Sequence, residues 1–282
     1  MIFTGNPTLD IAVFAIFGLL IGSFLNVVVH RLPIMLEARW ARESAEFSGA
    51  EVPPSAAFNL VVPRSRCPHC GHAIAWHENI PVISYALLGG KCAGCKKAIA
   101  LRYPLVELAC GAVFGFCAAR FGTGVSGVVW CGFSAALLAL ALIDWDTTLL
   151  PDDLTLPLLW AGLIAAALHW IPVNLSDALW GAVGGYMSLW LVYWGFKLLT
   201  GKEGMGFGDF KLYAALGVWF GWQCLIPIIL MASLIGAMIG IALKMNSQLR
   251  EGGYIPFGPF LAGAGFTTLL WGPGNVRQLI GL

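Results

Sequence analysis

Long hydrophobic runs alternate with short polar stretches along almost the whole chain. A helix needs about 20 apolar residues to cross the hydrocarbon core of a bilayer. Runs of this kind predict an all-α, polytopic membrane protein with about eight transmembrane helices. The predicted spans cover residues 9–29, 104–122, 124–143, 154–172, 178–199, 209–222, 224–243 and 255–271. The run at 209–222 is short, which indicates a tilted or partly re-entrant segment.

The composition supports a membrane protein and excludes several other classes. Of the 282 residues, 59% are hydrophobic and 11% are charged, with a mean hydropathy of +0.80. Soluble domains carry about 25% charged residues, so neither a water-soluble enzyme nor a disordered chain fits. The net charge of +1 gives no reason to expect nucleic acid. Residues 1–9 contain no basic side chain, so we expect the first run to stay as a membrane anchor.

Lysine and arginine predict the orientation, because they gather on the cytoplasmic side of membrane proteins. If eight spans alternate in direction, 14 of the 16 basic residues fall on one side, and only Arg120 and Arg277 fall on the other. Seven spans would move one basic group to the wrong side. We therefore expect a cytoplasmic loop between the first two spans and both chain ends on the opposite side.

The loop at residues 30–103 is the only long polar segment, and it contains two C-x-x-C pairs 21 residues apart. Two such pairs are typical of a tetrahedral zinc site with four thiolate ligands. Disulfides are the alternative, and a cytoplasmic location disfavours them. Because four cysteines leave no open coordination position, we expect a structural zinc ribbon. The predicted ligands are Cys67, Cys70, Cys92 and Cys95.

Other residues with metal-binding or cofactor-binding chemistry have simpler interpretations. Four cysteines lie inside predicted spans and are expected to be packing residues. They are Cys110, Cys117, Cys131 and Cys224. Surface positions are expected for His69, His72 and His77. A run of acids could bind a cofactor, but a solvated helix face is favoured. These acids are Glu43, Glu46 and Glu51.

Carboxylates at the ends of predicted spans are costly in a membrane and indicate function. Asp144 ends the third span, and Asp209 follows Gly206 and Gly208 in a G-x-G-D string at the start of the sixth. Two carboxylates that share one proton could activate water and protonate a carbonyl, as aspartyl proteases do. The glycines would let a substrate backbone lie close. The alternative is that both aspartates only terminate helices, Asp209 as an N-cap.

Several short strings in a fixed order extend this picture over nearly the whole chain. They lie at residues 22–33, 64–70, 79–85, 92–95, 102–107, 144–157, 204–211 and 255–262. In their order and spacing the chain resembles the bacterial type IV prepilin peptidases (prepilin leader peptidase/N-methyltransferases), which are aspartyl proteases of the G-x-G-D type.

The resemblance implies a specific reaction and location. Members of this family remove the short basic leader of type IV prepilins and type II secretion pseudopilins, after a glycine at the cytoplasmic face of the inner membrane. They then methylate the new N-terminus with S-adenosylmethionine. The resemblance makes Asp144 and Asp209 the catalytic pair, with Asp146 as the rival of the first. Asp152 is expected at a helix start or in a loop, and Lys211 is expected to interact with Asp209.

The expected organisation has three parts. Residues 1–29 form the first transmembrane helix, residues 30–103 the cytoplasmic domain with the four-cysteine zinc site, and residues 104–282 the protease core. Residues 30–103 contain no G-x-G-x-x-G string, so a dinucleotide-type cofactor fold is not expected. Two rival hypotheses are a transporter with a zinc-ribbon regulatory domain and a non-catalytic secretion-assembly protein that docks a partner through it.

Overall fold

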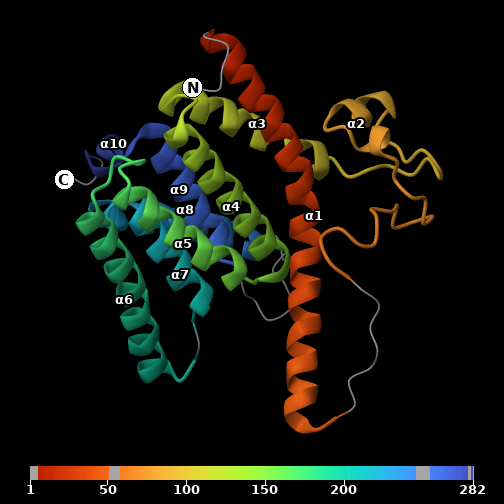
Figure 1. Ribbon diagram of the computed structural model, residues 1–282. Helices are drawn as coiled ribbons and strands as arrows, with labels where there is room; N and C mark the ends of the chain where they lie inside the picture. The colour runs from red at the N-terminus through yellow and green to blue at the C-terminus, as the bar shows by residue number, and fades with distance from the viewer. Residues whose placement is uncertain (1–5, 51–57, 203, 246–254, 279–280, 282) are drawn as a thin grey trace. The chain divides into compact units, whose positions relative to one another are not determined.

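The computed structural model describes residues 6–50, 58–202, 204–245, 255–278 and 281 (Figure 1). The described residues form helices joined by loops, with two isolated β-bridges and no strand. The helices are α1 (Pro7–Ser48), η1 (Trp76–Asn79), α2 (Ile83–Leu87), α3 (Arg102–Phe121), α4 (Val125–Thr147), α5 (Asp152–Ala167), α6 (Leu175–Thr200), α7 (Phe207–Phe220), η2 (Trp222–Cys224), α8 (Leu225–Met245), α9 (Gly258–Trp271) and α10 (Pro273–Gln278). Each predicted span falls on one of these helices, which confirms the all-helical prediction.

The chain forms two compact units, residues 1–135 and 136–282. In the first unit, α1 packs antiparallel against α3 (Figure 1). A Cβ atom on Gly18 would lie 2.8 Å from Cα of Gly111, and one on Gly22 would lie 2.7 Å from Cα of Glu107. Small residues at these positions let the two backbones approach closely, as they do between helices in membranes.

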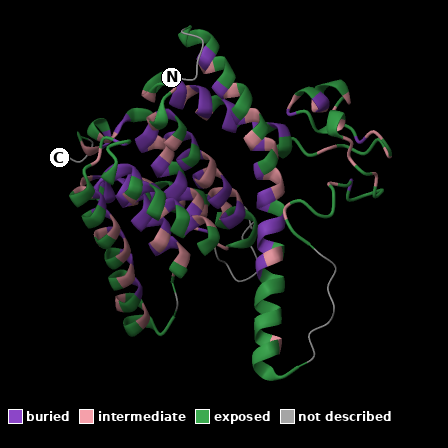
Figure 2. Ribbon diagram, in the orientation of Figure 1, coloured by how far each residue is buried: buried purple, intermediate pink, exposed green. Residues whose placement is uncertain are grey.

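Helix α1 is longer than the predicted first span. It continues through the buried Pro33 and ends at Ser48, where Gly49 caps it with a positive φ of 69°. The first part of the polar loop is therefore an extension of the same helix. Its residues 37–44 are exposed, and Figure 2 shows the change from mixed burial to full exposure along α1.

In the second unit, α7 is the central helix. It packs against α5, α6, α8 and α9, and its residues 212–220 are all buried. Gly181 of α6 faces Gly217 of α7 with the two backbones in contact. Because no side chain separates these helices, α7 lies deep inside the unit.

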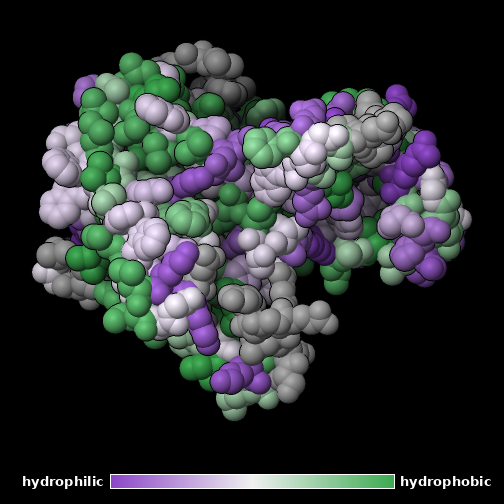
Figure 3. All heavy atoms as spheres, turned by 90° about the horizontal axis from the view of Figure 1, so that it is seen from below, coloured by the Kyte–Doolittle hydropathy of each residue, from purple (hydrophilic) through white to green (hydrophobic). Residues whose placement is uncertain are grey.

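Four of the described helices are long and apolar enough to cross a membrane, namely α1, α3, α4 and the segment of η2 and α8. Helices α5, α7 and α9 have 16, 14 and 14 residues. At 1.5 Å per residue, 14 residues reach only about 21 Å. Helices α5, α7 and α9 thus coincide with predicted spans, but each is shorter than the helix of about 20 residues that crosses a bilayer. Many large hydrophobic side chains are exposed, including those of Ile16 and Phe17 of α1. Figure 3 shows hydrophobic residues gathered over part of the face that it presents.

Candidate active site and candidate metal centre

Asp144 lies near the C-terminal end of α4, and its side chain is only 4% exposed. The backbone N–H of Gly258, which begins α9, donates a hydrogen bond of 2.9 Å to Oδ2 of Asp144. A hydrogen bond donated to a carboxylate favours its charged form. Two segments that are 114 residues apart in sequence are joined by this contact.

Asp209 lies in the first turn of α7 and is 7% exposed. The N-cap of this helix is Gly206, so the interpretation of Asp209 as an ordinary N-cap is wrong. Among the described residues, no hydrogen-bond partner reaches its buried Oδ1 atom. A buried polar atom without a partner is rare in folded proteins and indicates a functional group.

Leu150 connects the surroundings of the two aspartates. A Cβ atom on Gly208 would lie 2.6 Å from Cβ of Leu150, and one on Gly258 would lie 3.1 Å from Cδ1 of Leu150. The residue before Asp209 and the residue bonded to Asp144 therefore both contact the same side chain. The structure thus brings the two predicted carboxylates into one buried site.

The two glycines of the G-x-G-D string have different surroundings. At Gly208 the space for a side chain is filled by Leu150, so glycine is required there by packing and not by a substrate. At Gly206 the nearest atom to an added methyl group would be Oδ2 of Asp209, at 3.7 Å. Only Gly206 therefore leaves open space beside the carboxylate.

The neighbouring charged residues lie outside this buried site. Asp146 is exposed, unlike Asp144 two residues earlier. Asp152 is the first residue of α5, as predicted, and both of its carboxylate oxygens accept hydrogen bonds from Nζ of Lys211, at 2.6 and 2.7 Å. Lys211 thus binds Asp152, where the sequence suggested Asp209 as its partner. The ion pair joins the N-terminal ends of α5 and α7.

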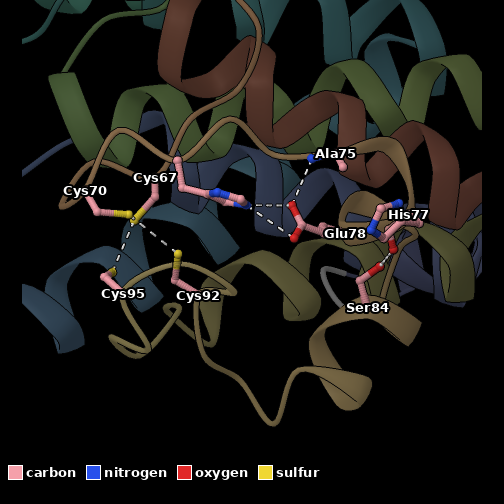
Figure 4. Close-up of polar contacts among 9 residues, drawn as sticks. Cys67, Cys70, Ala75, His77, Glu78, Ser84, Cys92 and Cys95 are labelled. Carbon is pink, nitrogen blue, oxygen red and sulfur yellow. Dashed lines mark hydrogen bonds and ion pairs between the residues drawn. The ribbon is translucent and has the colours of Figure 1, made fainter.

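The four predicted metal ligands also come together. Their sulfur atoms all lie within 4.8 Å of one another, so the cluster could hold a metal ion. Two tight turns present them, in which the N–H of Gly71 donates to the carbonyl of Cys67 and that of Lys96 to the carbonyl of Cys92. Two S···S distances join one turn to the other, Cys67–Cys95 and Cys70–Cys92, and both are 3.9 Å (Figure 4).

Local hydrogen bonds prepare two of these thiols for a metal. Backbone N–H groups of His69 and Cys70 lower the pKa of the Cys67 thiol to about 6. The pKa of Cys92 is also lowered, chiefly by the backbone N–H of Cys95. Thiolates are the form of cysteine that binds metals. The turns therefore favour the thiolate form of Cys67 and Cys92. At Cys70 the backbone N–H of His72 also lowers the pKa, but burial and hydrogen bonds with the other three thiols outweigh it and raise the pKa of Cys70 to about 11.

The nearby histidines have other roles. Nε2 of His72 lies 3.0 Å from a carboxylate oxygen of Glu78, which also accepts a 2.9 Å hydrogen bond from the N–H of Ala75 (Figure 4). These contacts lower the pKa of Glu78, the backbone hydrogen bond contributing most. His69 and His77 are exposed.

The remaining cysteines and acids follow the simpler interpretations. The four cysteines in predicted spans are buried, which agrees with packing roles. Glu43 and Glu46 are exposed on the extension of α1, and Glu51 lies outside the described residues. The described part of this acidic run is therefore a solvated helix face.

Comparison with known proteins gives the family. The Bacterial Peptidase A24 N-terminal domain matches residues 16–121, and the Type IV leader peptidase family matches residues 131–241. A prepilin leader peptidase/N-methyltransferase of Stutzerimonas stutzeri is 52% identical over 95% of this chain and 92% of its own length. The chain belongs to the type IV leader peptidase family. No solved structure matches it.

Two further relatives carry the same name. The protein of Pseudomonas aeruginosa is 54% identical over 93% of this chain and 91% of its own length. The protein of Aeromonas hydrophila is 49% identical over 97% of this chain and 94% of its own length. These comparisons confirm the family that the sequence strings indicated.

Two residues of this family member's site were not identified from the sequence. Gly258 belongs to the string at 255–262, which marked the last span without indicating a role. Leu150 belongs to the string at 144–157 and has no polar group to suggest a function. Their presence within those strings was the available signal, and only the structure shows what each contacts.

Proposed function

We propose that the chain is a membrane aspartyl endopeptidase that removes the leader of type IV prepilins or type II secretion pseudopilins, after a glycine. The observation that carries the proposal is the buried site in which Asp144 and Asp209 both lie beside residues that contact Leu150. The names of the relatives support the same reaction. They do not favour the transporter or the docking protein.

The proposed mechanism assigns a different role to each carboxylate. Asp144 accepts the N–H of Gly258, which favours its charged form, and it takes a proton from the attacking water. Asp209, with its unpartnered Oδ1, is protonated before the reaction and donates this proton to the scissile carbonyl oxygen. When the C–N bond of the tetrahedral intermediate breaks, Asp144 gives its proton to the departing amine of the mature pilin, and a hydroxyl group of the intermediate returns a proton to Asp209. Two adjacent carboxylates that cannot both ionise supply one base and one acid.

The proposed topology has eight spans, with the site at the cytoplasmic face of the bacterial inner membrane. It is supported by the helices found at all eight predicted positions and by the distribution of 14 of 16 basic residues on one side. Asp144 lies at the end of α4, and Asp209 lies at the start of α7. Alternating spans bring these two ends to the same face, where a leader that stays in the cytoplasm is accessible.

We propose a structural zinc ion at the four-cysteine cluster. A tetrahedral site with Zn–S bonds of about 2.3 Å has sulfur atoms about 3.8 Å apart. The two distances of 3.9 Å fit this value. Zinc bound by four thiolates would staple the turns at Cys67 and Cys92 together, and it would leave no coordination position for a substrate.

A second reaction is proposed on the names of the relatives, namely methylation of the new N-terminus with S-adenosylmethionine as donor. None of the described residues is assigned to that cofactor. The cytoplasmic domain at residues 30–103 is proposed to contribute to this reaction, and the core at residues 104–282 is proposed to carry out the cleavage.

The test compares three asparagine variants in purified, detergent-solubilised protein with a prepilin substrate. Asp144→Asn and Asp209→Asn should each abolish leader removal, because each lacks one group of the pair. Asp146→Asn is the matched control, since it makes the same change at an exposed position two residues away, and it should keep cleavage near the wild-type rate. Wild-type cleavage by both buried variants would disprove the carboxylate pair.

A further inference from the structure

The segment of residues 58–101, which contains the four cysteines, is tied to the start of α3. The N–H of Val82, directly before α2, donates a 2.8 Å hydrogen bond to Oε2 of the buried Glu107. Within the segment, the hydroxyl of the buried Ser84 donates to the carbonyl of His77 and accepts the N–H of Ile80, both at 2.8 Å. Helices η1 and α2 are therefore held together and against α3.

This attachment sets the depth of α2. Helix α3 is one of the candidate membrane spans and begins at Arg102, so Glu107 lies in its second turn. Five residues of helix correspond to about 7.5 Å. If α3 crosses the membrane, α2 lies at the level where that span enters the bilayer. A group held there meets lipid headgroups and the ends of the acyl chains.

The exposed side of α2 is apolar. Ile83 and Leu87 stand four residues apart on one side of the helix and are 57% and 82% exposed. Trp76 of the adjacent η1 is 81% exposed. These three residues are called the α2 face here. Tryptophan and aliphatic residues at membrane depth are typical of an interfacial anchor.

The charge of the segment at residues 58–101 favours an anionic partner. Five basic side chains of the segment are exposed, namely Arg64, Arg66, Lys91, Lys96 and Lys97. Residues 58–101 contain one acidic residue, Glu78, and it contacts His72. Basic residues close to a membrane are attracted by anionic lipid headgroups. The basic leader of the proposed substrate would instead be repelled.

We propose that the segment of residues 58–101 binds the bilayer surface, with the α2 face inserted at the boundary between headgroups and acyl chains and the five basic residues on anionic phospholipids. This adds a membrane-anchoring surface to the two reactions of the proposed function. It rests on α3 crossing the membrane, and it is independent of either reaction.

Photocrosslinking of the full-length protein in lipid nanodiscs, first without substrate and then with prepilin added, tests the proposal. A benzophenone amino acid replaces Leu87 in one protein and Val61 in the control, because Val61 is similarly exposed, at 77%, in the same segment but outside the α2 face. Position 87 should form phospholipid adducts at least about fivefold more often than position 61. The yield should rise severalfold when phosphatidylglycerol is added to phosphatidylcholine.

Three results would overturn the proposal. They are equal lipid adducts at the two positions, predominant crosslinks to a second copy of the chain, and crosslinks that appear only when prepilin is added. Hydrogen exchange of the unmodified protein gives an independent reading. Amides of residues 83–88 should exchange several times more slowly in nanodiscs with phosphatidylglycerol than in those without it, while residues 58–62 should not change. Equal exchange in both lipids would also contradict anchoring.

Discussion

Replacement of Gly258 by alanine should disable the peptidase without unfolding the protein. The new Cβ atom would lie 2.6 Å from Oδ2 and 3.1 Å from Cγ of Asp144. Ordinary contacts of a Cβ atom begin at 3.4 Å, so the carboxylate must move by about 0.8 Å or more. That movement breaks the hydrogen bond from the Gly258 N–H, which is 2.9 Å long in the native site.

The expected loss of activity follows from the free energy that this hydrogen bond contributes. A hydrogen bond to a charged group contributes about 1.5–3 kcal/mol. If that stabilisation is lost in the transition state, kcat/KM should fall roughly 10- to 150-fold. The fall should appear in kcat, because the proposed mechanism uses the carboxylate of Asp144 in the chemical step.

Gly263→Ala is the matched control. It makes the same substitution in the same helix, α9, at a position where an added Cβ meets no atom within 4 Å. The assay measures prepilin cleavage by gel shift over a range of substrate concentrations, with the melting temperature of each variant recorded. The reasoning is refuted if Gly258→Ala cleaves as fast as Gly263→Ala, or if both variants lose activity equally.

Three further predictions concern the candidate active site and the four-cysteine cluster. Gly208→Ala should lower cleavage at least about tenfold because it collides with Leu150, whereas Gly206→Ala should retain most activity; equal effects would contradict the packing argument. Lys211→Met should slow cleavage less than about fivefold, since a half-exposed ion pair contributes roughly 0–1 kcal/mol, and a complete loss of cleavage would show a catalytic role for the amine. Cys67→Ser should remove the bound zinc measured by mass spectrometry, while Cys110→Ser should keep the wild-type content; undiminished zinc in the first would exclude the cluster.

Local patterns predicted the helices and the cysteine cluster well, because both depend on residues close in sequence. Each of the eight hydrophobic runs corresponds to a helix in the structure. The two C-x-x-C turns form through hydrogen bonds within four residues. The continuation of α1 to Ser48 was not predicted, because a polar stretch following a span does not reveal whether the helix goes on.

Contacts between distant segments were harder to predict. The G-x-G-D string and the position of Asp144 indicated a carboxylate pair, but nothing in the sequence linked Gly258 to it across 114 residues. The ion pair of Lys211 with Asp152 was likewise missed, because Lys211 stands nearer to Asp209 in sequence. Short-range spacing identifies chemical groups, whereas their partners depend on how the helices pack.

Because α7 lies among other helices, its length does not have to match the thickness of the bilayer. A lipid-facing helix that is too short for the hydrocarbon core tilts or thins the membrane around it, at an energetic cost. Helix α7 has only 14 residues, but α5, α6, α8 and α9 surround it. Its neighbours, rather than lipid, set the depth of Asp209. The carboxylate of Asp209 can therefore stay at a constant height when membrane thickness changes with lipid composition or temperature.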